Sequence, residues 1–176
     1  MLKKILIILA AITAVFLIAA ALQPDEFRVA RAIAIQAPPE AVFAHVNDLR
    51  KWEAWSPWAK LDPNAKNSFE GAPSGKGAIM RWAGNHEVGE GSMTIVESRR
   101  PNFIQLRLDF LKPFAATSMA EFTLVPQGDE TLVTWSMYGE NNYTAKMIGL
   151  VMNCEKMISE QFDKGLASLK QVVETQ

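Results

Sequence analysis

The sequence predicts an α+β fold in which a curved antiparallel sheet wraps around a long C-terminal helix, preceded by an N-terminal transmembrane helix. Three observations predict it: an uncharged apolar run over residues 5–22, segments of alternating apolar and polar residues between positions 77 and 139, and an apolar stripe at helical spacing after Asn142. A sheet with one apolar face needs a cover, which only the terminal helix is long enough to provide. We expect such a curved sheet to enclose a cavity.

The N-terminal segment has the length and composition of a membrane span. Residues 5–22 contain no charge, and Thr13 is the only polar residue among them. These eighteen residues reach about 27 Å as a helix, close to the roughly 30 Å hydrocarbon thickness of a bilayer. A cleaved signal peptide is the alternative, because three alanines before Leu22 would suit a cleavage site. We therefore expect residues 1–24 to be a membrane anchor or signal segment and residues 25–176 to form the ligand-binding domain.

The charges that flank this segment predict its orientation. Lys3 and Lys4 precede it, whereas Asp25 and Glu26 follow it, so the positive-inside rule keeps the N-terminus cytoplasmic. We expect a membrane-anchored domain on the extracytoplasmic side, periplasmic or outside the cell. The alternative is a protein secreted after signal cleavage.

Composition narrows the function classes. The 176 residues suffice for one domain with its own core. The formal net charge is −1 and the basic residues are scattered, so nucleic acid is not an expected partner. Cys154 is the single cysteine, which excludes an intramolecular disulfide and a cysteine metal cluster.

The domain is predicted to begin with a strand and two short helices. Apolar residues alternate over residues 27–36. Proline is tolerated in a first helical turn, so residues 38–46 predict a short helix. Asp48 is expected to cap a second helix that continues through Trp52. Residues 56–67 are rich in Pro, Asp and Asn and are predicted to form a loop.

The middle of the chain predicts an antiparallel meander. Its strand-like segments are residues 77–84, 91–98, 103–110, 120–125 and 131–139. Pro101-Asn102 and Gln127-Gly128-Asp129 predict hairpin turns between neighbouring strands. The alternation gives the sheet one apolar face.

The last element is predicted to be one helix from about Tyr143 to Val173, capped by Asn142. Its apolar stripe consists of Met147, Val151, Cys154, Ile158, Phe162, Leu166, Leu169 and Val173. At about 45 Å the helix is longer than any predicted strand. It must therefore lie across the sheet.

Several segments resemble one known family. They are "IQAPPEAVFAHVNDLRKWEAWSPW", "GKGAIMRWAGNHEVGEGSMTIVES", "DFLKPF", "TLVTWSMYGEN" and "FDKGLASLK". Together they resemble the polyketide cyclase/dehydrase and lipid-transport branch of the START-like, or SRPBCC, superfamily over about residues 27–173. The resemblance implies the helix-grip fold, with a hydrophobic cavity between the curved sheet and the terminal helix. Members bind lipids, sterols, polyketides or plant hormones, and some are cyclases, so the resemblance alone implies only an apolar ligand.

We expect binding, or transport, of a hydrophobic small molecule such as a lipid or polyketide in an internal cavity. One alternative is a polyketide cyclase or dehydratase that uses the same cavity. Another is an interaction or stress-related module with no ligand. His45 and His86 are the only histidines and neither is in a recognisable catalytic pattern, so we expect no catalytic residue, no metal and no cofactor. Arg31 and Glu97 are in phase with apolar neighbours, and either they point inward to hold a polar group or the strand register breaks there.

The expected cavity lining consists of aromatic, methionine and aliphatic side chains on the apolar faces. Methionine suits a pocket of variable shape because its side chain is flexible. Trp52 is expected in the core, whereas the two tryptophans that flank Ser56-Pro57 are expected at the rim. The predicted ligand-binding residues are Trp55, Trp58, Met80, Trp82, Met93, Leu106, Leu108, Phe110, Trp135, Met137, Met147 and Val151.

Overall fold

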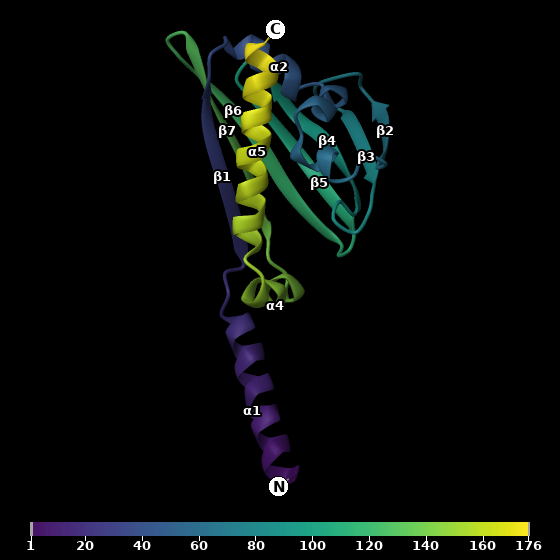
Figure 1. The fold of residues 1–176 in the computed structure, drawn as a ribbon, viewed down its shortest axis with the longest axis vertical. Helices are drawn as coiled ribbons and strands as arrows, with labels where there is room; N and C mark the ends of the chain where they lie inside the picture. Colours follow the sequence, from purple (N-terminus) through teal and green to yellow (C-terminus); the bar gives the residue numbers. More distant parts are fainter. Residues whose placement is uncertain (1, 176) are drawn as a thin grey trace.

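The computed structural model describes residues 2–175 and contains a seven-stranded antiparallel sheet, a long helix against its concave face and a separate N-terminal helix (Figure 1). The elements are α1 (Leu2–Ala21), β1 (Glu26–Ile35), α2 (Pro39–Val46), the 3-10 helix η1 (Leu49–Ala54), α3 (Pro57–Leu61), β2 (Lys66–Gly71), β3 (Ala78–Ala83), β4 (Glu90–Arg99), β5 (Phe103–Lys112), β6 (Ala116–Gln127), β7 (Glu130–Glu140), α4 (Tyr143–Val151) and α5 (Cys154–Glu174). This is the helix-grip architecture that the sequence predicts.

The sheet has the strand order β1-β7-β6-β5-β4-β3-β2. Glu26 at the start of β1 pairs with Glu140 at the end of β7, and Ser118 near the start of β6 pairs with Gly139. The start of β1, the end of β7 and the β5–β6 hairpin therefore lie at the same end of the sheet. This is the end from which α1 departs (Figure 1), and we call it the α1 end.

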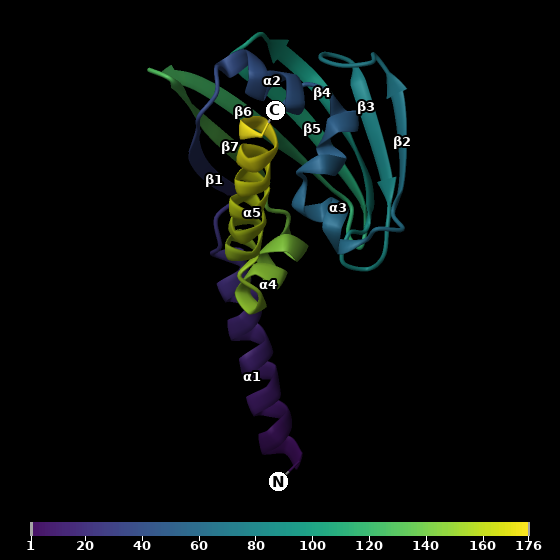
Figure 2. The same cartoon turned by 45° about the horizontal axis from the view of Figure 1, so that its top comes forward.

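Helix α5 covers the concave face of the sheet, and α2, η1 and α3 cover the rest of that face (Figure 2). Asp48 caps η1 as predicted, since its side chain accepts a hydrogen bond from the Arg50 amide at 3.0 Å. The buried face of α5 includes Phe162, Leu166, Leu169 and Val173, which confirms the predicted apolar stripe over this part of the chain.

The prediction of one unbroken terminal helix is wrong. Helix α4 ends at Val151, Met152 adopts an extended conformation, and α5 starts at Cys154. The Asn153 side chain accepts a hydrogen bond from the Lys156 amide at 3.0 Å and so caps α5. Asparagine is favoured at a helix cap over the helix interior, because its side chain competes with the helix for hydrogen bonds to backbone groups.

The predicted loop over residues 56–67 is also wrong in part. Ser56 precedes α3, with Pro57 in its first turn, and the segment ends in the edge strand β2. Only Phe69 of β2 is half-buried, and the other five residues of the strand are exposed. A strand with so little apolar content has no alternation that a sequence pattern could reveal.

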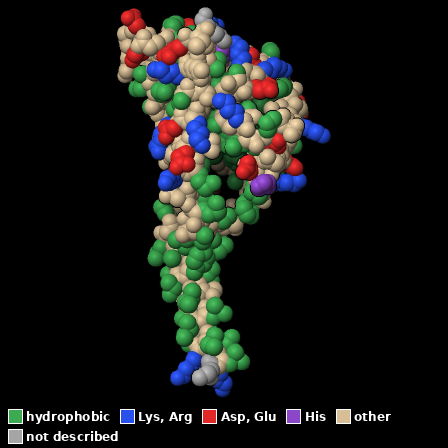
Figure 3. Space-filling model, viewed as in Figure 1, with side chains coloured by type: hydrophobic (Ala, Val, Ile, Leu, Met, Phe, Trp, Pro, Cys, Tyr) green, Lys and Arg blue, Asp and Glu red, His purple; other side chains and the backbone are tan. Residues whose placement is uncertain are grey.

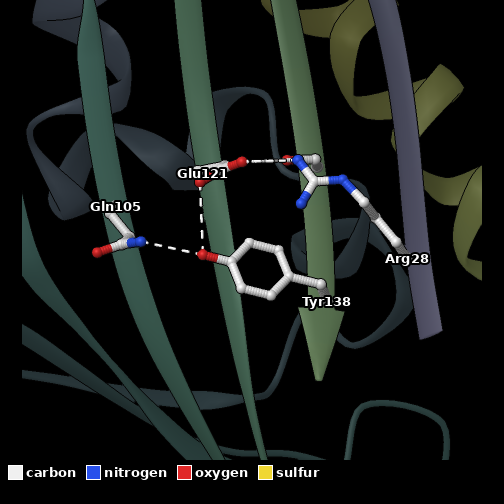
Figure 4. A network of polar contacts seen from close by, with 5 residues as sticks. Arg28, Gln105, Glu121 and Tyr138 are labelled. Atoms are coloured by element: carbon white, nitrogen blue, oxygen red, sulfur yellow. Dashed lines mark hydrogen bonds and ion pairs between the residues drawn. The ribbon is translucent and has the colours of Figure 1, made fainter. Parts of the chain in front are cut away.

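The outer face of the sheet carries a polar network, shown in Figure 4. Arg28 donates a hydrogen bond to Glu121 at 2.8 Å, and its guanidinium lies 5.0 Å from the centre of the Tyr138 ring. Gln105 donates to the Tyr138 hydroxyl at 3.0 Å, and Ser136 donates to Glu121 at 3.1 Å. These side chains alternate with the apolar ones, so they point away from α5.

Helix α1 stands apart from the sheet and exposes apolar side chains along its length (Figure 3). Among the described residues it is the one helix that is long and apolar enough to cross a membrane. It is therefore a candidate membrane span.

Candidate functional site

An aromatic stack fixes the distance between α5 and the sheet. The Trp135 ring of β7 stacks on the Phe162 ring of α5, with centroids 4.0 Å apart and planes 7° apart. On the other side, the Phe122 ring lies 4.9 Å from Trp135. A Cβ atom at Gly165 would lie 2.8 Å from the Trp135 ring, so only glycine lets α5 come this close.

Next to this stack lies a cavity of about 600 Å³ between the sheet, α5, α3 and η1. The structure brings together eight of the predicted ligand-binding residues around it: Trp58, Met80, Trp82, Met93, Leu108, Phe110, Trp135 and Met137. They come from α3 and from strands β3, β4, β5 and β7. Their side chains converge because each occupies the concave face of its strand or the inner face of its helix.

The cavity occupies only the half of the concave face nearest the α1 end. On β5 the lining includes Leu108 and Phe110, whereas Leu106 is fully buried and does not contact the cavity. On β4, Met93 lines the cavity and Ile95 is fully buried. The half farther from α1 is filled by side chains that pack beneath α2 and η1. The sheet is thus divided into a solid half and a hollow half.

Leu106 is consequently not a lining residue, contrary to the prediction. Strand periodicity places it on the correct face, but helices α2 and η1 close that part of the face. Trp55 is not at the rim either, because it is fully buried, with its ring 4.7 Å from Trp52 and 5.6 Å from Trp135. The start of α3 at Pro57 turns the chain so that Trp55 points into the core, where Trp52 also lies as predicted.

Met147 and Val151 do not line the cavity either, because they belong to α4. Helix α4 lies beside α1 rather than on the sheet, and the side chain of Val151 is exposed. The predicted stripe assumed one continuous helix. The break at Met152 separates these two residues from the cavity.

Several lining residues were missed by sequence reasoning. They are Leu49, Trp52, Glu53, Ser56, Ala59, Asp62, Pro63, Ala65, Asn67, Phe69, Val88, Ala120, Ile158 and Phe162. Ile158 and Phe162 belong to the predicted apolar stripe of α5, so that stripe was the signal that could have found them. Half of the other twelve come from residues 56–67, the segment that was predicted to be a loop.

Few polar side chains reach the cavity, and they lie on its η1–α3–β2 side. The Asp62 carboxylate accepts hydrogen bonds from the backbone amides of Asn64 at 3.0 Å and Asn85 at 2.7 Å. It therefore holds the β3–β4 hairpin against the end of α3. Among residues 2–175, no group of three or more His, Cys, Asp or Glu side chains could hold a metal ion.

Arg31 and Glu97 do not form an inward polar pair. Arg31 contacts Asp163 of α5 at 3.3 Å, and Glu97 contacts Arg99 at 3.0 Å. The β4–β5 register shifts between Ile95 and Glu97, which confirms the alternative prediction of a register break for Glu97, whereas the β1–β7 register is continuous at Arg31.

Two other charged or titratable residues also lie away from the cavity. Arg81 bonds to Glu70 on the outer face, and this hydrogen bond raises the pKa of Arg81. His45 is buried in α2. Neither side chain contributes to the cavity lining.

Comparisons with solved structures agree with this architecture. Protein CV1439 from Chromobacterium violaceum superposes with a TM-score of 0.60 and 16% identity, covering 86% of this chain and 99% of that one. Protein MLL2253 from Mesorhizobium loti gives a TM-score of 0.63 and 15% identity, covering 85% and 98%. The Aha1 dimer from Colwellia psychrerythraea gives 0.61 and 13%, covering 84% and 96%. At these identities the likeness shows the fold alone.

A search of curated protein sequences found no relative that matches the chain. The family model described as "Polyketide cyclase / dehydrase and lipid transport" matches residues 26–174, which is nearly all of the chain outside α1. The match therefore includes every strand of the sheet and both C-terminal helices. The chain belongs to the polyketide cyclase/dehydrase and lipid-transport family.

Proposed function

We propose that the domain formed by residues 25–176 binds a hydrophobic small molecule, such as a lipid or polyketide, in the cavity beside α5. We further propose that residues 1–24 anchor this domain to a membrane with the domain on the extracytoplasmic side. The observation that carries the first proposal is the cavity of about 600 Å³ with a largely apolar lining. Small-molecule sites in proteins are typically concave, mostly apolar and about 300 to 1,000 Å³ in volume.

The lining chemistry supports an apolar ligand with a small polar group. Aromatic and methionine side chains surround most of the cavity, whereas Glu53, Asp62 and Asn67 lie on one side. Burial of roughly 300 Å² of apolar ligand surface contributes roughly 7 kcal/mol at about 25 cal/mol/Å². Part of this is offset by the loss of ligand freedom, so we expect micromolar affinity at best.

Contacts of α1 support retention of the anchor. Ala20 is fully buried, and the Tyr143 hydroxyl donates a hydrogen bond to the Leu17 carbonyl at 3.0 Å. Cleavage at the alanines before Leu22 would remove these partners and expose the apolar surface of α4. The basic residues before α1 and the acidic residues after it support the outward orientation.

A fluorescent fatty acid tests the binding proposal. We expect dansyl undecanoic acid to bind the full-length chain in detergent micelles, with energy transfer from the cavity tryptophans to the dansyl group. Leu108→Trp should lower the affinity at least tenfold, because Leu108 is half-buried, lines the cavity, and a larger ring there occupies the ligand's space. The matched control is Thr123→Trp on the exposed outer face of β6, which adds the same ring outside the cavity.

The outcome depends on the difference between the two variants. Circular dichroism should show that both variants are folded. Equal affinity for the wild-type chain, Leu108→Trp and Thr123→Trp would show that the probe binds elsewhere, and absence of saturable binding to the wild type would remove the proposal.

A further inference from the structure

The exposed apolar side chains outside α1 are concentrated at one end of the molecule. Among the described residues, the large ones that are exposed are Leu22, Leu111, Phe114, Val125, Tyr143, Val151, Met152 and Met157. All but Val125 lie at the α1 end. Leu111 and Phe114 belong to the β5–β6 hairpin. Leu22 follows α1, and the remaining residues belong to α4, to the break after it and to the first turn of α5. We call the set Leu111, Phe114, Tyr143, Val151, Met152 and Met157 the collar.

Singly scattered apolar side chains on a protein surface need no explanation, but a clustered set marks an interaction site. The exposed fractions of Phe114 and Val151 are 60% and 76%, so neither packs on the domain. The hairpin and α4 come from distant parts of the sequence, and the sheet register brings them to the same end. The collar is therefore a feature of the fold and not of one segment.

The collar is held at a fixed position relative to α1. The Asn141 amide donates to the Asp25 carbonyl at 2.7 Å, and the Asn141 side chain donates to the Pro24 carbonyl at 3.2 Å. Lys146 of α4, whose side chain is almost fully buried, forms an ion pair with Asp25. These bonds join the linker between α1 and β1 to the residue after β7 and to α4.

The depth of α4 follows from its bond to α1. Tyr143 bonds to Leu17, which lies four residues before the end of α1 at Ala21. Four residues of helix correspond to about 6 Å. If α1 spans the bilayer, the Tyr143 ring lies in the interfacial region where tyrosine and tryptophan are enriched in membrane proteins. The apolar residues of α4 then lie at the same depth.

Two lysines at the α1 end are paired with carboxylates of the protein. Lys112 at the β5–β6 hairpin bonds to Glu90 at 2.8 Å, and Lys146 bonds to Asp25. These lysines are thus neutralised within the protein rather than by lipid phosphates. The chemistry of the collar therefore fits an uncharged apolar layer rather than an anionic surface.

The cavity lies in the half of the domain that carries the collar. Its lining extends to Phe110, two strand positions after Leu108, and to Ile158 in the second turn of α5. Figure 3 shows that the molecule is hollowed near the α1 end, with hydrophobic side chains along part of the hollow and acidic and histidine side chains at its margin. Phe110 of the lining is next to Leu111 of the collar in β5. Ile158 of the lining is next to Met157 of the collar in α5.

From this geometry we infer that the collar rests on the lipid surface into which α1 inserts, and that the cavity opens toward that bilayer. The ligand of the proposed binding function is then an amphiphile that resides in the membrane and reaches the cavity without crossing water. The statement about the ligand rests on the proposed function. The statement about the collar rests on the exposed apolar surface and on the proposed membrane insertion of α1.

Labels in the collar test its contact with lipid. The full-length chain with Cys154→Ser is reconstituted into phosphatidylcholine vesicles and labelled with the fluorophore NBD at Phe114→Cys or Val151→Cys. The matched control is Val125→Cys, because Val125 is an exposed apolar residue at the opposite end of the sheet. We expect lipids with a nitroxide on the acyl chain to quench both collar labels at least twofold more than the control label, at low and at high salt.

Equal quenching at all three positions would overturn the inference, since the domain would then stand clear of the bilayer or lie on its side. Quenching that disappears at high salt would also overturn it, because it would indicate an electrostatic contact.

A second measurement separates this inference from the proposed function. The double variant Phe114→Glu/Val151→Glu should bind dansyl undecanoic acid in detergent with unchanged affinity, because neither side chain lines the cavity. When the probe is supplied in phosphatidylcholine vesicles, the variant should load at least fivefold more slowly than the wild type, with Leu108→Trp as the background signal. Equal loading rates would contradict delivery from the membrane. Absence of binding in detergent by the wild type would instead refute the proposed function, and the quenching experiment would still decide the position of the collar.

Discussion

Replacement of Gly165 by alanine tests whether the stack of α5 on Trp135 fixes the shape of the domain. The added Cβ would lie 2.8 Å from the Trp135 ring and 3.0 Å from Cδ of Pro57. Neither neighbour can retreat easily, because Trp135 is held between the rings of Phe162 and Phe122 and the pyrrolidine ring of Pro57 is rigid. The methyl group can be accommodated only if α5 moves away from the sheet or the Trp135 ring shifts toward the cavity that it lines.

Two opposing effects decide the sign of the change in stability. Alanine in place of glycine inside a helix stabilises it by about 1 kcal/mol. Overpacking of a closed core costs about 1 to 3 kcal/mol, and contacts on two rigid rings place this site at the upper end. We therefore expect Gly165→Ala to lower the free energy of unfolding by about 2 kcal/mol, which is the overpacking cost minus the propensity gain.

Gly149 provides the matched control. It lies in α4, and a Cβ there would meet nothing within 4 Å, so only the helix propensity changes. Gly149→Ala should leave the stability unchanged or raise it by up to about 1 kcal/mol. The assay is urea unfolding of the full-length chain in mild detergent, followed by tryptophan fluorescence and circular dichroism. A Gly165→Ala chain as stable as the wild type, or more stable, would refute the close approach of α5 to the sheet.

Three further predictions concern the anchor junction and the cavity. Asn142 accepts a hydrogen bond from the Ala145 amide at 2.9 Å, so Asn142→Ala should destabilise α4 by about 1 kcal/mol, seen as faster hydrogen exchange there. The hydrogen bond and charge of Lys146 lower the pKa of Asp25. The ion pair between Asp25 and Lys146 therefore stabilises the junction at pH values above the ordinary aspartate pKa of about 4. This stabilisation is lost as the pH falls through the lowered pKa. The protection of the α4 amides, measured relative to their intrinsic exchange rate at each pH, should therefore fall at low pH in the wild type, and the same pH response in Asp25→Asn would contradict this. Trp58→Ala should weaken binding of dansyl undecanoic acid about tenfold, because an aromatic contact worth about 1.4 kcal/mol is lost. If the variant and the wild type bound the probe with equal affinity, Trp58 would be excluded from the site.

The sequence was sufficient to predict the strands β3 to β7 and the helix α5 that line most of the cavity, but not α3 or β2. Strands such as β5 and the buried stripe of α5 have strong periodicity because one face of each packs on the core. The same periodicity identified Leu108 and Trp135 as lining residues. It could not separate Leu108 from Leu106, because both lie on the concave face and only the placement of α2 and η1 closes one half of it.

The break between α4 and α5 was hidden for a different reason. Met147 and Val151 continue the apolar spacing of α5, although they belong to α4, in which no residue is buried. Periodicity records that a face is apolar but does not distinguish burial in a core from exposure in the collar. The signal for the break was Asn153, whose capping bond competes with a continuous helix.

The role of Trp55 depended on a helix of only five residues. Pro57 starts α3, and this helix turns Trp55 into the core while its next tryptophan, Trp58, faces the cavity. Short helices form through tertiary contacts rather than through their own propensity. Their presence is correspondingly difficult to predict from sequence.

The most direct test of the account is an experimental structure of the full-length chain purified from the membranes of its host, combined with native mass spectrometry of the same sample. The account predicts continuous density for an apolar molecule between Phe110, Trp58 and Phe162, and a bound mass that Leu108→Trp eliminates. A cavity filled by protein side chains, with no bound mass released from the wild-type chain, would contradict the central claim.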